Sequence, residues 1–227
     1  MNNVRTVADA KHDFYKAFPK PVNSIYRRVI DELLVEVHLL RVSQTFTYDS
    51  IFAIGVATAF DRFMAGYEPI SDLEDIFKGL CQALTLDSEQ IRLESLNSTD
   101  LATKFPDQTK SLFTTLESSA DLDSLMGQVR AIASNPKFKY SRLFAVGIFT
   151  LLEVALPEVI ADTEKRQALL TQVSDTLKIS SERLLKDLDL YRSNLEKVQQ
   201  NRQMMDDMVE AERKKREKQT IKPAITA

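Results

Sequence analysis

The chain has few residues that shape turns. Its 227 residues include 5 glycines and 7 prolines, and no Asn-Gly or Asp-Gly pair marks a β-hairpin. Apolar residues instead recur at intervals of three and four along most of the chain. The sequence therefore predicts an all-α fold, and β-strands have little support.

Cysteine is almost absent. The single thiol, Cys81, lies in an apolar stretch and excludes an intramolecular disulfide, which is compatible with a reducing compartment. A buried, unreactive thiol is the favoured interpretation, and a reactive thiol is the alternative.

Long hydrophobic runs are also missing. The longest uncharged runs, 50–60 and 143–152, are about ten residues each, whereas about twenty are needed to cross a bilayer. The first 18 residues contain Asp9 and Asp13 and no apolar segment, which does not fit a signal or transit peptide. Both runs are therefore predicted to be buried helices of a soluble protein.

An excess of positive charge is absent as well. The formal net charge is −3, which argues against nucleic acid as a partner of the whole protein. One basic run, 213–218, could contact nucleic acid, anionic lipid or an acidic protein, but a solvated helix end is the simpler interpretation. The acidic residues that precede it, 206–212, would weaken binding to phosphate.

Local signals predict several helix ends. Thr6 and Asp9 fit a capping box at the start of the first helix. Gly66 precedes Pro69 and is predicted to end a helix. Pro157 is predicted to occupy a first helical position, where a missing N–H is tolerated.

The strongest positive feature is an internal repeat. Residues 46–58 recur as 138–150 with six identical positions, whereas average composition gives about one by chance. The match extends on both sides, so the sequence predicts two copies of a helical unit, about 30–96 and 122–188. Together they predict one core domain over residues 1–188.

Glycine interrupts the repeated apolar helix at Gly55 and Gly147. Glycine inside a helix costs about 1 kcal/mol relative to alanine, so a compensating role is expected. We predict that both glycines lie where helices cross closely.

The C-terminal part differs in pattern. Apolar residues alternate at steps of four and three, typical of a heptad seam. We predict a projecting coiled-coil helix over 189–218, followed by a flexible tail over 219–227. The predicted partner-binding residues are Leu188, Tyr191, Leu195, Val198, Arg202, Met205 and Val209.

The first part of this seam, from Leu188 to Val198, is expected to be an exposed stripe. The alternative is that the seam packs on the protein's own core. Arg202 stands at a seam position, and burying an unpaired charge is costly, so a monomer with a heterologous partner is favoured over a homodimer.

Recognisable catalytic motifs are missing from the sequence. No phosphate-binding glycine loop, nucleophile elbow or zinc-ligand spacing occurs, and His12 and His38 are the only histidines. A metal site at Asp9 and His12 is less favoured than structural roles, and His38 is interpreted as a structural histidine. No catalytic, metal or cofactor-binding residue is predicted.

Two carboxylates, Asp61 and Glu153, occupy equivalent positions of the copies. Adjacent acids can divide general acid and general base roles. The favoured interpretation is that each pairs with an arginine or faces solvent.

Several segments together resemble the thylakoid formation family of cyanobacteria and chloroplasts, whose members are also described as photosystem II biogenesis proteins. The resemblance covers essentially the whole chain. Its specific segments are Thr6–Lys11, Phe18–Pro21, Tyr26–Val29, Tyr48–Phe63 and Tyr140–Gly147.

The resemblance implies a cyanobacterial-type, non-enzymatic protein. It implies a peripheral position on the cytoplasmic face of the thylakoid membrane, support of photosystem II assembly and repair, and association with the FtsH protease. It implies no cofactor and no catalytic residue. The competing class is an all-α enzyme, or a protein that binds a pigment or another small molecule between the duplicated halves.

Overall fold

The computed structural model describes residues 5–117 and 120–221, and over these residues the fold is all-α, as predicted. Two short 3₁₀ turns, η1 (Ile70–Asp72) and η2 (Ala120–Leu122), join some of the helices. The helices are α1 (Val7–Ala17), α2 (Ser24–Arg41), α3 (Ser50–Phe63), α4 (Leu73–Ala83), α5 (Ser88–Lys104), α6 (Pro106–Thr114), α7 (Asp123–Ser134), α8 (Arg142–Ala155), α9 (Pro157–Ala161), α10 (Thr163–Leu177) and α11 (Ser181–Ile221).

Two helix starts follow the local signals. Thr6 and Asp9 form the predicted capping box at the start of α1. Pro157 is in the first turn of α9, and Gly66 follows α3 with φ +80°, a left-handed conformation that favours glycine. The predictions for Thr6 and Pro157 are confirmed. The prediction that Gly66 ends the helix is wrong, because α3 ends at Phe63 with Met64 as its C-cap and Gly66 lies in the turn that follows.

The centre of the fold is the crossing of the repeated helices α3 and α8. A Cβ built on Gly55 would lie 1.7 Å from the Leu143 carbonyl oxygen, and one on Gly147 would lie 1.9 Å from that of Ile51. Further along, the Thr150 hydroxyl donates to the Thr58 hydroxyl at 3.3 Å. The predicted close crossing is confirmed. Each glycine lies against the backbone of the other helix.

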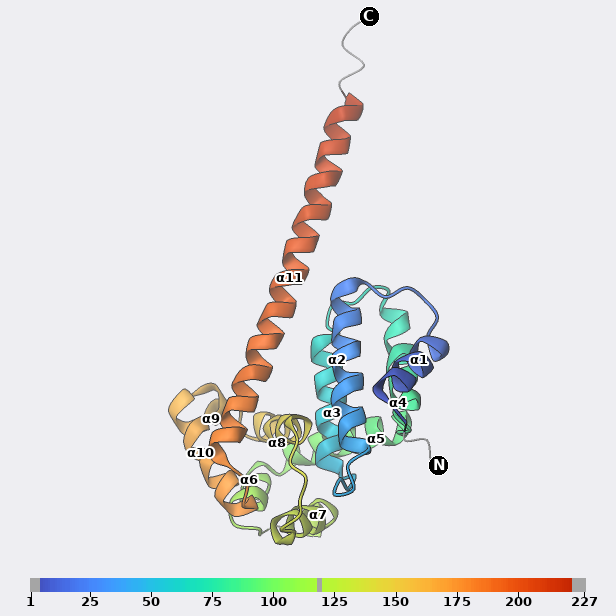
Figure 1. The fold of residues 1–227 in the computed structure, drawn as a ribbon. Coiled ribbons are helices and arrows are strands. Elements are labelled where there is room, and N and C mark those ends of the chain that lie inside the picture. Colours follow the sequence, from blue (N-terminus) through green and yellow to red (C-terminus); the bar gives the residue numbers. More distant parts are fainter. Residues whose placement is uncertain (1–4, 118–119, 222–227) are drawn as a thin grey trace, which may run out of the picture.

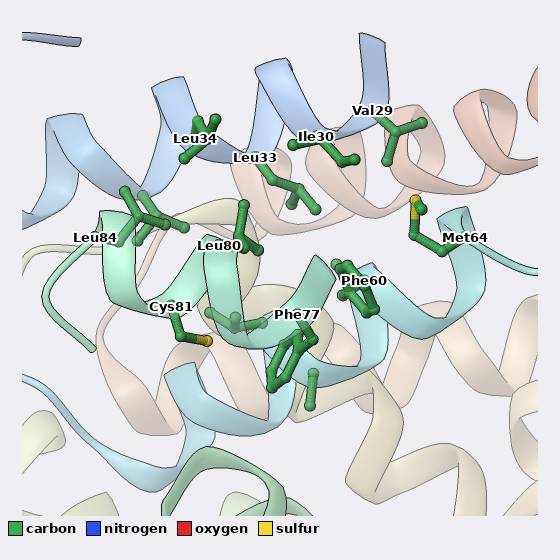
Figure 2. Packing of buried hydrophobic residues seen from close by; sticks show 14 of the residues in the cluster. Val29, Ile30, Leu33, Leu34, Phe60, Met64, Phe77, Leu80, Cys81 and Leu84 are labelled. Carbon is green, nitrogen blue, oxygen red and sulfur yellow. The ribbon is translucent and has the colours of Figure 1, made fainter. Parts of the chain in front are cut away.

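Two hydrophobic clusters lie on either side of this crossing. One joins α1, α2 and α4 to α3, and the other joins α6, α7 and α10 to α8. Figure 2 shows part of the first cluster, where residues of α2 face α4 and the end of α3. The labelled side chains are Val29, Ile30, Leu33, Leu34, Phe60, Met64, Phe77, Leu80, Cys81 and Leu84.

The same polar contact occurs once in each copy. The Tyr48 hydroxyl donates to Glu94 on α5 at 2.9 Å, and the Tyr140 hydroxyl donates to Asp187 on α11 at 2.9 Å. The first turns of α11 therefore occupy in the second copy the place that α5 occupies in the first.

Helix α11 continues beyond the core as a single long helix (Figure 1). The predicted tail, 219–227, begins inside this helix, and residues 222–227 lie outside the described part of the chain. Among the described residues, no helix has the length and apolar character required to cross a membrane.

Candidate interaction site

The base of α11 is part of the core. Leu188 and Tyr191 are 4% and 6% exposed, and Leu195 and Val198 are half-buried against the first hydrophobic cluster. The expectation of an exposed stripe from Leu188 to Val198 was therefore wrong. The alternative interpretation, that this part of the seam packs on the protein's own core, is correct.

The physical reason is the duplication itself. The second copy needs a fourth helix to cover α8, and α11 supplies it. Helix α5 runs to Lys104, eight residues past the predicted end of the first copy, and the aligned position in the second copy is Lys197. Because α5 packs on the core up to this point, the equivalent part of α11 is expected to do the same. The core therefore extends beyond the predicted boundary at 188.

Tyr191 shows how closely the base of α11 is packed. Its ring meets Phe63 of α3 edge to face, with the ring centroids 5.4 Å apart. Burial raises the pKa of the Tyr191 hydroxyl to about 12. The phenol therefore stays neutral at physiological pH and acts as a core side chain.

Arg202 links α11 to the end of α3. Its guanidinium Nη1 donates to the Ala65 carbonyl oxygen at 3.0 Å, just beyond the end of α3. Gly66 lies beside the Arg202 side chain, and its φ of +80° is the reason that glycine is favoured there. The charge at this seam position is thus held by a carbonyl oxygen of the same chain.

Beyond Arg202, the helix carries exposed apolar side chains. We define the distal arm as residues 203–221 of α11. Met204, Met208 and Val209 are 63%, 68% and 67% exposed, and Met205 is half-buried. The heptad seam had identified Met205 and Val209 but missed Met204 and Met208, which the spacing of four along the helix could have revealed.

Charge is segregated along the distal arm. Acidic residues are concentrated in 206–212, and basic residues dominate 213–218. Lys214 and Glu210 form an ion pair of 2.7 Å where the two segments meet. An apolar stripe on a helix with separated charges can orient a partner helix in one direction.

A cleft opens at the base of α11. This α2–α11 cleft has a volume of about 460 Å³ and is lined by residues of α2, α3, α8 and α11, so it lies between the two copies. Its apolar lining includes Val29, Leu33, Phe63, Val146, Tyr191 and Val198. A pocket of this size and character is typical of small-molecule sites.

The two equivalent carboxylates do not form a catalytic pair. Arg92 donates to Asp61 at 2.8 Å, and Arg62 forms a separate ion pair with Glu153. The interpretation that each acid pairs with an arginine is confirmed. Each carboxylate is therefore engaged in its own ion pair and does not face the other.

The other candidate residues have structural surroundings. The Asp9 carboxylate accepts from the Thr6 backbone N–H at 2.8 Å, and this bond lowers the pKa of Asp9. His38 is buried in α2. In the described part of the chain, no three His, Cys, Asp or Glu side chains are grouped so that they could hold a metal ion.

Cys81 is buried in the first hydrophobic cluster, as predicted. Burial raises the pKa of its thiol to about 12. Because the thiolate is the reactive form, this cysteine is unreactive near neutral pH.

Asp49 is the acid with the most unusual environment. It caps α3, where its carboxylate accepts from the Phe52 backbone N–H at 2.8 Å, and burial raises its pKa to about 6. In the second copy, Ser141 caps α8 by accepting from the Phe144 backbone N–H at 3.1 Å. One copy thus uses a neutral cap where the other uses a titratable one.

This difference predicts a pH dependence of stability. The pKa of Asp49 is higher in the folded state than the ordinary value of 3.8, so folding favours the protonated carboxyl. Its stabilising contribution is complete below pH 3.8 and is lost as the pH rises through about 6. Relative to the Asp49→Ser variant, the native protein should lose at most about 3 kcal/mol of unfolding free energy across this range.

Urea denaturation at several pH values measures this difference. Asp162, which caps α10, provides the matched control, because the Lys165 backbone N–H lowers its pKa. The difference in unfolding free energy between the native protein and Asp162→Ser should therefore change in the opposite direction. The native protein should gain stability relative to this variant as the pH rises. If the unfolding free energies of the native protein and Asp49→Ser changed in parallel with pH, the raised pKa of Asp49 would be contradicted.

Comparison with known proteins covers both the core and the arm. A family model described as thylakoid formation protein matches residues 6–220. The chain is 48% identical over 217 residues to protein Thf1 of Acaryochloris marina and 50% identical over 220 residues to protein Thf1 of a Cyanothece species. These alignments cover 96% of this chain and 88% and 92% of the two relatives.

A solved structure also matches. The structure of Psb29 superposes with a TM-score of 0.76 at 40% sequence identity. The superposition covers 93% of this chain and 98% of that one. The likeness therefore includes most of the long C-terminal helix as well as the bundle.

Proposed function

The chain belongs to the thylakoid formation protein family, and on that basis we propose that it is a non-enzymatic factor supporting thylakoid organisation and photosystem II assembly and repair. It acts by holding partner proteins. The observation that carries this proposal is the distal arm, which presents exposed methionines on a helix anchored to a rigid core.

The distal arm suits a helical partner. Burying an apolar side chain contributes about 1.5 to 3 kcal/mol before the cost of ordering is subtracted. Met204, Met208 and Val209 offer three such exposed side chains beside the half-buried Met205, and methionine adapts to surfaces of different shape. A partner helix along this stripe would gain enough energy for specific but reversible binding.

The partners we propose are the FtsH protease and photosystem II assembly or repair complexes. The protein would act as a monomer, bound peripherally to the cytoplasmic face of the thylakoid membrane. The basic run 213–218, at the end of the arm, supports an approach to anionic headgroups.

Affinity capture from solubilised thylakoid membranes tests this proposal. FtsH and photosystem II subunits should be recovered by the full chain and lost after deletion of residues 204–227. The deletion begins there because Val198 and Arg202 still contact the core. A double substitution, Met204→Asp with Met208→Asp, should also abolish capture.

The matched control lies on α5. Leu93 and Leu96 are 59% and 67% exposed, so Leu93→Asp with Leu96→Asp makes the same chemical change away from the arm. This control should capture the partners normally. Capture that survives the arm changes but is lost in the α5 control would place the interaction surface on the core and overturn the proposal for the arm.

A further inference from the structure

The α2–α11 cleft is separate from the distal arm, because its lining on α11 ends at Asn201. Its floor is formed by apolar side chains from four helices, among them Val29, Leu143 and Val198. Ile25, Phe63 and Val198 are only half-buried, so part of this apolar surface remains open to solvent. An apolar ligand that covers it would be stabilised by the hydrophobic effect.

The rim of the cleft carries one uncompensated cation. Arg28 donates to Glu32 at 3.0 Å, and Arg142 pairs with Glu36 at 2.8 Å, so these charges are balanced. Lys197 also lines the cleft, and no ion pair of the described residues includes it. The opening is therefore positively charged at one place.

Amide groups lie beside this lysine. Asn194 and Asn201, which are one turn of α11 to either side of Lys197, both line the cleft. Their side chains can donate hydrogen bonds to an anionic group held by the Lys197 ammonium. The rim thus suits a small anionic head, and the floor suits an apolar chain.

The volume of the cleft suits a small occupant. The cleft offers about 460 Å³, within the range of small-molecule sites. A single apolar chain fits this space.

We propose that the α2–α11 cleft binds a medium-chain fatty acid, taken up as a monomer from solution. The acyl chain lies along Val29, Phe63 and Val198, and the carboxylate meets the Lys197 ammonium. Because the cleft is lined by α2 and α11, an occupant would also contact both copies and stabilise the packing of the base of α11.

Fluorescence titration with dansylaminoundecanoate tests the proposal on the purified full chain. The signal should saturate at one probe per protein, and dodecanoate should displace the probe. Dodecanol shares the chain but not the charge, and butyrate shares the charge but not the chain. Both should compete about tenfold less well or worse, because each lacks one of the two contributions.

Two substitutions on the same helix provide the matched pair. Lys197→Glu should weaken binding of the probe by about tenfold. This is the effect expected when an attractive charge contact near the surface is replaced by a repulsive one. Lys186→Glu makes the same change on an exposed side chain that does not line the cleft, and it should leave binding unchanged.

Methyl NMR of the native sequence provides a readout that needs no variant. Dodecanoate should shift the methyl resonances of Val29, Leu33 and Val198, which line the cleft. It should not shift those of Leu93 and Leu96, which are exposed on α5.

Three results would overturn the proposal: no saturable binding, equal competition by dodecanol, or equal affinity in the Lys197→Glu and Lys186→Glu variants. All measurements use purified protein without membranes or partners. Their failure would therefore leave the proposed function of the distal arm unaffected, and failed partner capture would leave the cleft unaffected.

Discussion

The Gly147→Ala variant is expected to lose about 3 kcal/mol or more of unfolding free energy, and Gly147→Leu should not fold stably. The added Cβ would lie 1.9 Å from the Ile51 carbonyl oxygen, which is a backbone atom of α3. A backbone oxygen cannot turn aside as a flexible side chain can, so α3 and α8 would have to move apart. Gly55→Ala should behave alike, because its Cβ would meet the Leu143 carbonyl oxygen.

Gly127 is the matched control for these changes. It lies inside α7, and a Cβ built there has no neighbouring atom within 4 Å. Gly127→Ala should therefore raise stability by up to about 1 kcal/mol, because alanine favours the helix. Urea denaturation followed by circular dichroism measures both variants, and equal midpoints for Gly147→Ala and the native protein would disprove the close-crossing explanation.

Leu188→Ala is expected to destabilise the protein by about 2 to 5 kcal/mol, since it leaves a cavity in the core. Leu188 is 4% exposed and belongs to the second hydrophobic cluster. Val209 follows the same heptad pattern but is 67% exposed on the distal arm. Val209→Ala should therefore change the unfolding free energy by no more than about 0.5 kcal/mol.

The same denaturation measurement compares the two variants directly. The contrast tests whether the seam divides into a part that stabilises the core and a part that is free to bind. Equal, small effects of Leu188→Ala and Val209→Ala would mean that the base of α11 contributes little to the core. A large effect of Val209→Ala would mean that the distal arm packs on the protein in solution.

Local features of the fold could be predicted because their causes are local. The capping box at Thr6 needs only a side chain and the backbone of the next few residues. The glycine crossing could be predicted because glycine inside a helix is costly unless close packing offsets it. The duplication relates Gly55 to Gly147 by sequence alone, since the two glycines occupy the same position of the repeat.

The seam of α11 shows where this kind of prediction fails. A heptad stripe has the same spacing whether it packs on its own core or on a partner. Leu188 and Val209 are therefore equivalent in pattern, although one is buried and the other exposed. Only the position of α8 beside α11 distinguishes them.

The sequence by itself determined the all-α class, the starts of α1 and α9 and the glycines of the α3–α8 crossing, because periodicity, caps and backbone freedom act over a few residues. The tertiary structure alone decided which arginine meets Glu153, that Arg202 binds the Ala65 carbonyl oxygen, and that a cleft lies between α2 and α11. Each of these depends on helices that are far apart in the chain. Their relative angles result from the packing of the whole core, which no short segment encodes.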